Sequence, residues 1–270
     1  MRSIASGDGW RASEFICDAG PEDRAFEERH EDLAIAVVVA GSFNYRTEAG
    51  AGLMHPGSIL LGAPGRCYEC DHDHGRGDRC IAFNFRPDYF AEIARDATGD
   101  ARFGFATAGL PASLGLASLA ARLEALADAP SLATEEAAIR LAHAVARIAS
   151  GATPTQTHPG ARDERRIADA LRFIEAHADE PLDLDRLAAV AGVSKFHFLR
   201  SFTRVVGLTP YRYLLLTRLR RAGAALAATD RSIADIAFDA GFGDLSTFNA
   251  HFRRAMGAAP GVWRRERGRI

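Results

Sequence analysis

Two stretches near the C-terminal end of the chain repeat one pattern: FLRSFTRVVGLTP at residues 198–210 and FNAHFRRAMGAAP at residues 248–260. Both fit F-x-x-x-F-x-x-x-x-G-x-x-P. Upstream of each, LDRLAAVAG at residues 184–192 is echoed by IADIAFDAG at residues 233–241. Each copy therefore predicts an amphipathic helix, a glycine turn and a second helix anchored by a phenylalanine pair. That arrangement is a helix-turn-helix unit, the module whose second helix lies in the major groove of DNA.

The charge distribution agrees with a DNA-binding C-terminal region. The 270-residue chain has a formal net charge of -2, but residues 186–270 hold 15 lysines and arginines against 5 acidic residues. A basic region on an acidic remainder is typical of a tethered nucleic-acid-binding domain. The sequence has no apolar run long enough to span a membrane, no apolar core of a signal peptide and only four cysteines. We therefore expect a cytoplasmic protein with reduced thiols and no membrane partner.

The rest of the chain predicts a second domain of a different kind. Short apolar or alternating runs within residues 31–90, separated by Gly, Pro and Asp, favour a small antiparallel barrel or sandwich. Helical spacing follows Pro87, and the apolar stripe Ala138, Leu141, Ala142, Val145 and Ile148 packs either within this domain or against a second subunit. We expect an α+β two-domain fold with a sensory or dimerisation domain at residues 1–150, a linker at 151–161 and a DNA-binding domain at 162–270.

The first reading helix is predicted over residues 194–205. Phe198 and Phe202 share one face because they are four residues apart, and they anchor the helix in the core. The opposite face holds Phe196, Leu199, Arg200 and Thr203. Arg200 suits the O6 and N7 atoms of guanine, whereas Lys195 and His197 suit phosphates. Phe196 either touches a thymine methyl group or sugar, or covers a neighbouring helix.

The second reading helix is predicted over residues 244–256, anchored by Phe248 and Phe252. Away from that anchor lie Ser246, Thr247, Asn249, Ala250 and Arg253, with Leu245 at the edge. This face is small and weakly polar, so we expect it to read sequence less sharply than the first. A single long helix over residues 211–228 would hold the two reading helices about one DNA turn apart, roughly 34 Å.

Residues 165–265 resemble the DNA-binding domain of the AraC/XylS family of bacterial transcription regulators, through SKFHFLRSFTRVVGLTPYRYL and the closing GAAPGVWRR. The resemblance implies base contacts from the positions Phe196, Leu199, Arg200, Leu245, Ser246, Thr247 and Ala250. Leu199 and Ala250 depart from the polar residues often found there. It also implies a cupin-like N-terminal domain, a promoter-DNA target, contact with RNA polymerase, a small-molecule effector and a homodimer. The sequence leaves the effector, the operator and the choice between activation and repression open.

Cysteine and histidine gather in the stretch CYECDHDHGRGDRC at residues 67–80. If residues 67–74 form a strand, then Cys70, His72 and His74 share a face, and a glycine turn returns Cys80 beside them. These four residues would suit zinc, although the sequence requires no cofactor. Purely structural packing and a redox-sensitive thiol pair are the alternatives.

Two other functions follow from that stretch. In one, occupancy or oxidation of the Cys/His set is itself the regulatory signal. In the other, a metal-bearing cupin enzyme carries a DNA-binding tail. Two thiolates leave no open metal position and no general base is recognisable, so we predict that the chain is not an enzyme.

Overall fold

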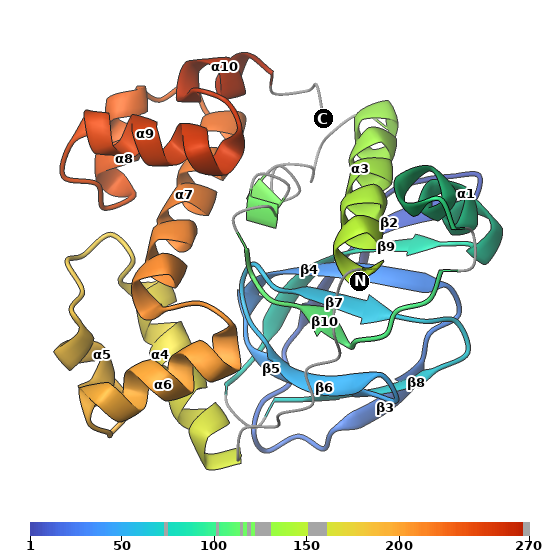
Figure 1. The fold of residues 1–270 in the computed structure, drawn as a ribbon, viewed down its shortest axis with the longest axis horizontal. Helices are drawn as coiled ribbons and strands as arrows, with labels where there is room; N and C mark the ends of the chain where they lie inside the picture. The colour runs from blue at the N-terminus through green and yellow to red at the C-terminus, as the bar shows by residue number, and fades with distance from the viewer. Residues whose placement is uncertain are drawn as a thin grey trace. The chain divides into compact units, whose positions relative to one another are not determined.

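The computed structural model of the chain describes residues 1–72, 75–100, 103–113, 116–117, 120–121, 131–150 and 161–266. By its internal contacts the chain divides into two compact units, residues 1–111 with 130–160 and residues 112–129 with 161–270 (Figure 1). The short segment 112–129 therefore groups with the C-terminal unit, although the helix that follows it groups with the first. The predicted linker lies, except for its last residue, outside the described residues, so the domain boundaries stay a prediction.

The first unit is built on two antiparallel sheets, in the strand orders β1-β2-β9-β4-β7-β10 and β3-β8-β5-β6. The six-stranded sheet contains β1 (Arg2–Gly7), β2 (Trp10–Cys17), β4 (Leu33–Gly41), β7 (Ile59–Gly62), β9 (Asp78–Phe85) and β10 (Gly109–Leu110). The four-stranded sheet contains β3 (Phe26–Arg29), β5 (Phe43–Thr47), β6 (Gly50–Met54) and β8 (Cys67–Asp71). Val38, Tyr45, Cys70 and Cys80 belong to one buried cluster drawn from both sheets. The predicted α+β fold with an N-terminal antiparallel sandwich is confirmed.

The central strand β9 shows how the six-stranded sheet is covered on both faces. Its side chains alternate: Cys80 and Ala82 join the cluster between the sheets, while Phe83 and Phe85 point to the other face. There Phe85 packs against Phe90 of α1 (Pro87–Thr98), with ring centroids 5.7 Å apart. The helix α3 (Ser131–Ser150) packs against α1, β1 and β2, so the two helices form the outer layer (Figure 1).

Two expectations for this unit need comment. The strands begin at Arg2 and not near residue 31, because β1 and β2 extend the sheet beyond β9. Of the apolar stripe on α3, Ala138, Leu141, Ala142 and Val145 are fully buried, whereas Ile148 is 40% exposed. No helix among the described residues is long and apolar enough to cross a membrane.

The second unit is helical, as predicted. Its helices are α4 (Ala161–Ala176), α5 (Leu184–Val190), α6 (Lys195–Val206), α7 (Pro210–Ala228), α8 (Ile233–Asp239), α9 (Leu245–Met256) and α10 (Pro260–Arg265). α5 with α6 and α8 with α9 are the two helix-turn-helix units, and α7 runs between them (Figure 1). In each unit the turn is a glycine with positive φ, Gly192 at 63° and Gly241 at 89°. The sequence repeat is thus a repeat of structure, down to the turn.

An apolar cluster holds the second helix-turn-helix unit on α7. It includes Leu219 of α7, Phe248 and Phe252 of α9, and Trp263 of α10. The indole Nε1 of Trp263 donates a hydrogen bond to the Gly223 carbonyl oxygen at 3.0 Å. Ala121, from the segment that precedes α3, is buried in the same cluster. The core of the C-terminal unit therefore includes a residue from the 112–129 segment.

Candidate nucleic-acid interface

Both predicted reading helices form, and each starts with a side-chain cap. The Ser194 hydroxyl accepts a hydrogen bond from the His197 amide at 3.4 Å, and the Asp244 carboxylate accepts one from the Thr247 amide at 2.8 Å. The four anchoring rings, Phe198, Phe202, Phe248 and Phe252, are 0% exposed. Because these rings are buried, the opposite faces of α6 and α9 turn to solvent.

The first reading face lies where the spacing of the phenylalanines places it. Leu199 is 37% exposed, and Arg200 and Thr203 are exposed. Among the described residues, Arg200 makes no ion pair and no side-chain hydrogen bond. Lys195 and Phe196 lie in the first turn of α6, but their side chains fall outside the described part of the chain. A guanidinium without a partner on an exposed helix face is ready to bind a base edge or a phosphate.

His197 differs from the rest of this set because it is engaged within the unit. Its Nε2 lies 3.4 Å from the Asp163 carboxylate of α4 and 3.3 Å from the Ser201 hydroxyl. Arg204 forms an ion pair with the same carboxylate at 2.6 Å. Partial burial opposes ionisation of Asp163, but the bonds from His197 and Ser201 outweigh it and lower its pKa. Asp163 therefore joins α4 to α6. It also bonds to the Nε2 atom of His197, the side chain that the sequence assigns to a phosphate contact.

The second reading face is exposed along its whole length. Its exposed residues are Leu245, Ser246, Thr247, Asn249, Ala250 and Arg253. Arg253, like Arg200, has no ion pair or side-chain hydrogen bond to any described residue. The hydroxyl and amide groups of this face can accept or donate hydrogen bonds, and the Ala250 methyl suits a thymine methyl group. Most of the side chains on this face are short and polar or carry a single methyl group.

A partly buried carboxylate of α4, that of Glu175, joins this helix to the connecting helix α7. Glu175 accepts hydrogen bonds from Tyr213 at 3.0 Å and Thr217 at 2.9 Å, and it pairs with Arg220 at 3.0 Å. Arg220 is only 7% exposed, so its ion pair with Glu175 is largely shielded from water. Arg218 donates to the carbonyl oxygens of Ala178 and Glu180, 2.6 and 2.7 Å away. The predicted long helix forms, from Pro210 to Ala228, while the distance between the reading helices stays a prediction.

Sequence reasoning missed the two carboxylates, Asp163 and Glu175, that organise this unit. Their partners lie 34 to 46 positions further along the chain. Their places on α4 follow from helical spacing, but their partners could not be found without the fold.

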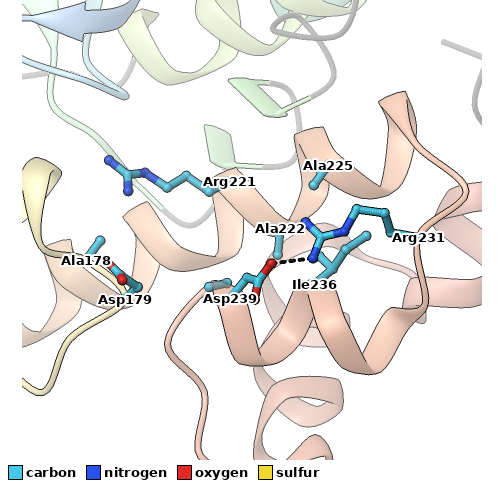
Figure 2. A pocket seen from close by; sticks show the side chains of 9 residues that line it. Ala178, Asp179, Arg221, Ala222, Ala225, Arg231, Ile236 and Asp239 are labelled. Carbon is cyan, nitrogen blue, oxygen red and sulfur yellow. Dashed lines mark hydrogen bonds and ion pairs between the residues drawn. The ribbon is translucent and has the colours of Figure 1, made fainter.

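A hollow in the same unit lies away from both reading faces. It is lined by Ala178, Asp179, Arg221, Ala222, Ala225, Arg231, Ile236, Asp239 and Ala240, where the end of α4 meets α7 and α8 (Figure 2). An ion pair between Arg231 and Asp239 lies at this hollow. None of the lining residues belongs to α6 or α9, so the hollow shares no residue with the two predicted reading faces.

The predicted metal set is only partly brought together. Cys70 and Cys80 both lie in the buried cluster between the sheets, and burial raises the pKa of both thiols. β8 ends at Asp71, so His72 lies just beyond the strand, and its Nε2 is 2.7 Å from the Asp78 carboxylate. His74 falls outside the described residues. The structure instead places Cys17 beside His72 and Asp78, a neighbour that the local sequence could not indicate.

Two family models match the chain. The AraC-like ligand binding domain matches residues 12–171, more than half of the chain, and a helix-turn-helix domain matches residues 187–266. The first match runs from within β2 into α4 and so covers most of the β-rich unit, and the second covers α6 to α10.

Three relatives illustrate the similarity. The right origin-binding protein of Escherichia coli K12 is 39% identical over 99 residues, covering 37% of this chain and 34% of that protein. The regulatory protein SoxS of the same organism is 36% identical over 101 residues, covering 37% of this chain and 94% of SoxS. An HTH-type transcriptional regulator of Bacillus subtilis 168, YbfI, is 28% identical over 221 residues, covering 80% of this chain and 78% of YbfI. The chain thus aligns with about a third of the length of the right origin-binding protein.

Proposed function

The chain belongs to the AraC family of transcription regulators, and we propose that it reads two successive major-groove segments of promoter DNA through α6 and α9. The N-terminal unit is the ligand-binding domain of that family. On this proposal it controls the DNA-binding unit, and the chain catalyses no reaction.

One observation carries the proposal: two capped helices, related by a structural repeat, each expose a polar face with an arginine that has no acidic partner among the described residues. Some exposed arginines of this unit are paired, such as Arg172 with Asp169 and Arg186 with Glu180. Arg212 and Arg254, like Arg200 and Arg253, are exposed and have no acidic partner among the described residues. Leaving cationic groups uncompensated favours a polyanionic partner. Names among the relatives, an origin-binding protein and transcription regulators, agree with such a partner.

We assign the roles along the two faces as follows. Arg200 reads a guanine, and Leu199 packs against a base or sugar. On α9, Ser246, Thr247, Asn249 and Ala250 read base edges through short hydrogen bonds and methyl contacts, while Arg253 contacts a base or a phosphate near the end of the helix. Phe196 and Leu245 complete the base-facing sets, and Lys195 contacts a phosphate. His197 contributes indirectly, because its bond to Asp163 orients α6.

The remaining partners belong to the same proposal. We expect RNA polymerase to contact the DNA-bound regulator, a small molecule to bind the N-terminal sandwich, and two chains to pair through that unit. Ile139 and Ile148 of α3 are 39% and 40% exposed, which supplies apolar surface for such pairing. The cytoplasm is the compartment in which a regulator of this kind meets promoter DNA.

A second candidate function is a DNA-binding regulator whose N-terminal domain responds to a metal ion. The juxtaposition of Cys17, His72 and Asp78 favours metal-dependent control over control by an organic effector alone.

The proposal is tested by binding of the full chain to a random-sequence duplex pool at several salt concentrations. We expect the logarithm of the affinity to fall linearly with the logarithm of the salt concentration, by about 0.9 for each phosphate neutralised. Arg200→Ala should weaken binding to a selected site, and Arg172→Ala, an arginine already paired with Asp169, should not. Absence of salt-dependent affinity for any duplex would contradict the proposal.

A further inference from the structure

Strand pairing in the N-terminal unit brings Cys17 beside His72 and Asp78, which lie more than fifty positions further along the chain. Cys17, the last residue of β2, lies directly opposite Asp78, the first residue of β9. Directly paired residues in an antiparallel sheet place their side chains on the same face, so the thiol and the carboxylate emerge together. His72 reaches the same carboxylate from the end of β8, with Nε2 2.7 Å from Asp78 Oδ2.

The three ligand atoms are close enough to share one ion. The Cys17 sulfur, a ring nitrogen of His72 and a carboxylate oxygen of Asp78 all lie within 4.8 Å of one another. Zinc bonds sulfur at about 2.3 Å and nitrogen or oxygen at about 2.0–2.2 Å in a tetrahedral array, which separates neighbouring ligand atoms by roughly 3.3–3.8 Å. A side-chain shift of about 1 Å would close the set onto zinc. We propose that Cys17, His72 and Asp78 form a binding site for a divalent cation of the zinc class.

The surroundings of His72 and Asp78 hold these two ligands in place. Their side chains are 2% and 8% exposed, so the pair is shielded from water. The Phe43 ring stacks on the His72 ring with centroids 5.6 Å apart, and the His72 carbonyl oxygen accepts a hydrogen bond from the Gly75 amide. Neighbours that fix a ring in this way strengthen a metal site, because less freedom is lost on binding.

Cys80 supports the site from one layer further out. Its thiol donates a hydrogen bond to the second carboxylate oxygen of Asp78, with Sγ and Oδ1 3.3 Å apart. This bond leaves Oδ2, the atom beside His72, to face the cation. The protein thus supplies one sulfur, one nitrogen and one oxygen, and the fourth position is open to water or an external ligand.

Cys17 gives the site its access to solvent. It is half-buried, whereas His72 and Asp78 are buried, so a cation would enter from the Cys17 side. An open fourth position and an accessible thiolate favour exchange of the cation over permanent structural binding. The site lies in the ligand-binding domain, where occupancy could change the state of the regulator.

The set differs from the one that the sequence indicated. Cys70, His74 and Cys80 are replaced by Cys17 and Asp78, and only His72 is common to both. Substitution of Cys17 against Cys70 therefore separates the two sets. Cys67 is a matched control, because it is half-buried at the start of β8 and three residues from Cys70, on the opposite face of the strand.

The test is metal binding by the full chain. The purified protein is stripped with a chelator under reducing conditions and titrated with Zn²⁺, and the bound metal is counted by mass spectrometry. Replacement of zinc by Co²⁺ adds a readout of the ligands, since a thiolate gives cobalt a charge-transfer absorption and a tetrahedral site gives it strong visible bands. We expect one equivalent of metal with both signatures.

The variants decide which residues hold it. Cys17→Ser and Asp78→Asn should weaken binding by more than the roughly 10- to 100-fold that outer-shell partners contribute, and Cys17→Ser should remove the thiolate band. Cys67→Ser should leave both the metal affinity and the thiolate band unchanged. Circular dichroism should show that every variant is folded. Less than half an equivalent in the parent protein, or full binding by folded Cys17→Ser, would overturn the proposal. Loss on Cys70→Ser with retention on Cys17→Ser would overturn it in favour of the other set.

DNA binding is an independent readout. The proposal predicts metal binding whether or not zinc alters affinity for DNA, and the DNA-binding unit contains none of the three ligands. Failure of the metal site would therefore leave the assignment of α6 and α9 intact.

Discussion

The two helix-turn-helix units share one sequence pattern but are supported in different ways. In the first, a carboxylate from α4 holds the reading helix: Asp163 is bonded to His197, Ser201 and Arg204 of α6. Aromatic rings support both reading helices: Phe202 packs edge to face on Tyr213, with centroids 6.0 Å apart, and Phe252 on Trp263, with centroids 5.9 Å apart. In the second unit, no carboxylate from another helix bonds to α9 among the described residues. The repeated phenylalanines, glycines and prolines therefore specify the helix pair and its aromatic anchor, and not the polar contacts that are added to it.

The reading faces have diverged in the same way. α6 places Arg200 near its middle, beside the exposed Leu199, whereas α9 presents short polar groups and carries Arg253 nearer its end. On the proposed assignment, we expect the first unit to discriminate one base strongly and the second to read several bases weakly. Each of the following changes tests one side of this comparison.

The largest expected effect is on the aromatic support of the second unit. Phe252→Ala removes a fully buried ring that touches Trp263, and cavities of this kind cost about 3–5 kcal/mol. Urea unfolding followed by fluorescence would measure the loss, since Trp263 reports on this unit and the other tryptophan, Trp10, on the first. A loss below about 1 kcal/mol would show that the ring does not support α9.

The two glycine turns should respond unequally. An alanine side chain at either position faces a left-handed backbone, at a cost of about 1–2 kcal/mol. At Gly241 the added carbon would also lie 2.8 Å from the Ala178 carbonyl oxygen, whereas at Gly192 nothing lies within 4 Å. Gly241→Ala should therefore destabilise the unit more than Gly192→Ala in the same unfolding experiment. Equal losses would mean that the approach of α4 to the second turn is not tight.

The difference between the reading faces is tested by paired arginine substitutions. Arg200→Ala should relax selection at one base position by about 1–3 kcal/mol, as expected for loss of a bidentate guanine contact. Arg253→Ala should reduce affinity more evenly across sequences. Sites selected from a random pool by each variant would measure this. An unchanged selected motif for Arg200→Ala would remove Arg200 from the reading face.

The smallest effect concerns Asp163 and disappears in acid. Its pKa is lowered in the folded protein, so its stabilising contribution is present above the unfolded-state pKa and is lost as pH falls through the folded pKa. Asp163→Asn should cost about 1 kcal/mol at neutral pH. The gap between parent and variant should close below about pH 4. Unfolding free energies measured across this range would show a constant gap if the Asp163 network did not stabilise α6.

Much of the C-terminal unit could be predicted from the sequence because its determinants are local. Helical spacing placed the four anchoring phenylalanines, and the local cap of α8 is a hydrogen bond that the Ser232 hydroxyl accepts from the Asp235 amide at 3.0 Å. The exposed positions on α6 and α9 could then be predicted from helical periodicity, because they lie opposite the buried phenylalanines. Asp163 and Glu175 escaped prediction because their partners come from other helices.

The N-terminal unit was less predictable because its site depends on strand pairing. The strands β1 and β2 were not predicted from the sequence. The segment WRASEFIC of β2 (Trp10–Cys17) mixes polar and apolar residues, and only some of its side chains are buried. Without β2 there was no reason to place Cys17 beside Asp78, 61 positions along the chain. The sequence therefore indicated a metal set drawn from residues 70–80 alone. In the structure, pairing of β2 with β9 adds Cys17 to His72 and Asp78.

The most direct test of the central claim is the site that the full chain selects from a random duplex pool. Two reading helices joined by the rigid α7 predict two conserved half-motifs, with centres about 10–10.5 base pairs apart. The half-motif read by α6 should be the sharper one and should contain a guanine that is lost as a requirement in Arg200→Ala. Selection of a single half-motif, of two at variable spacing, or of none would contradict the account.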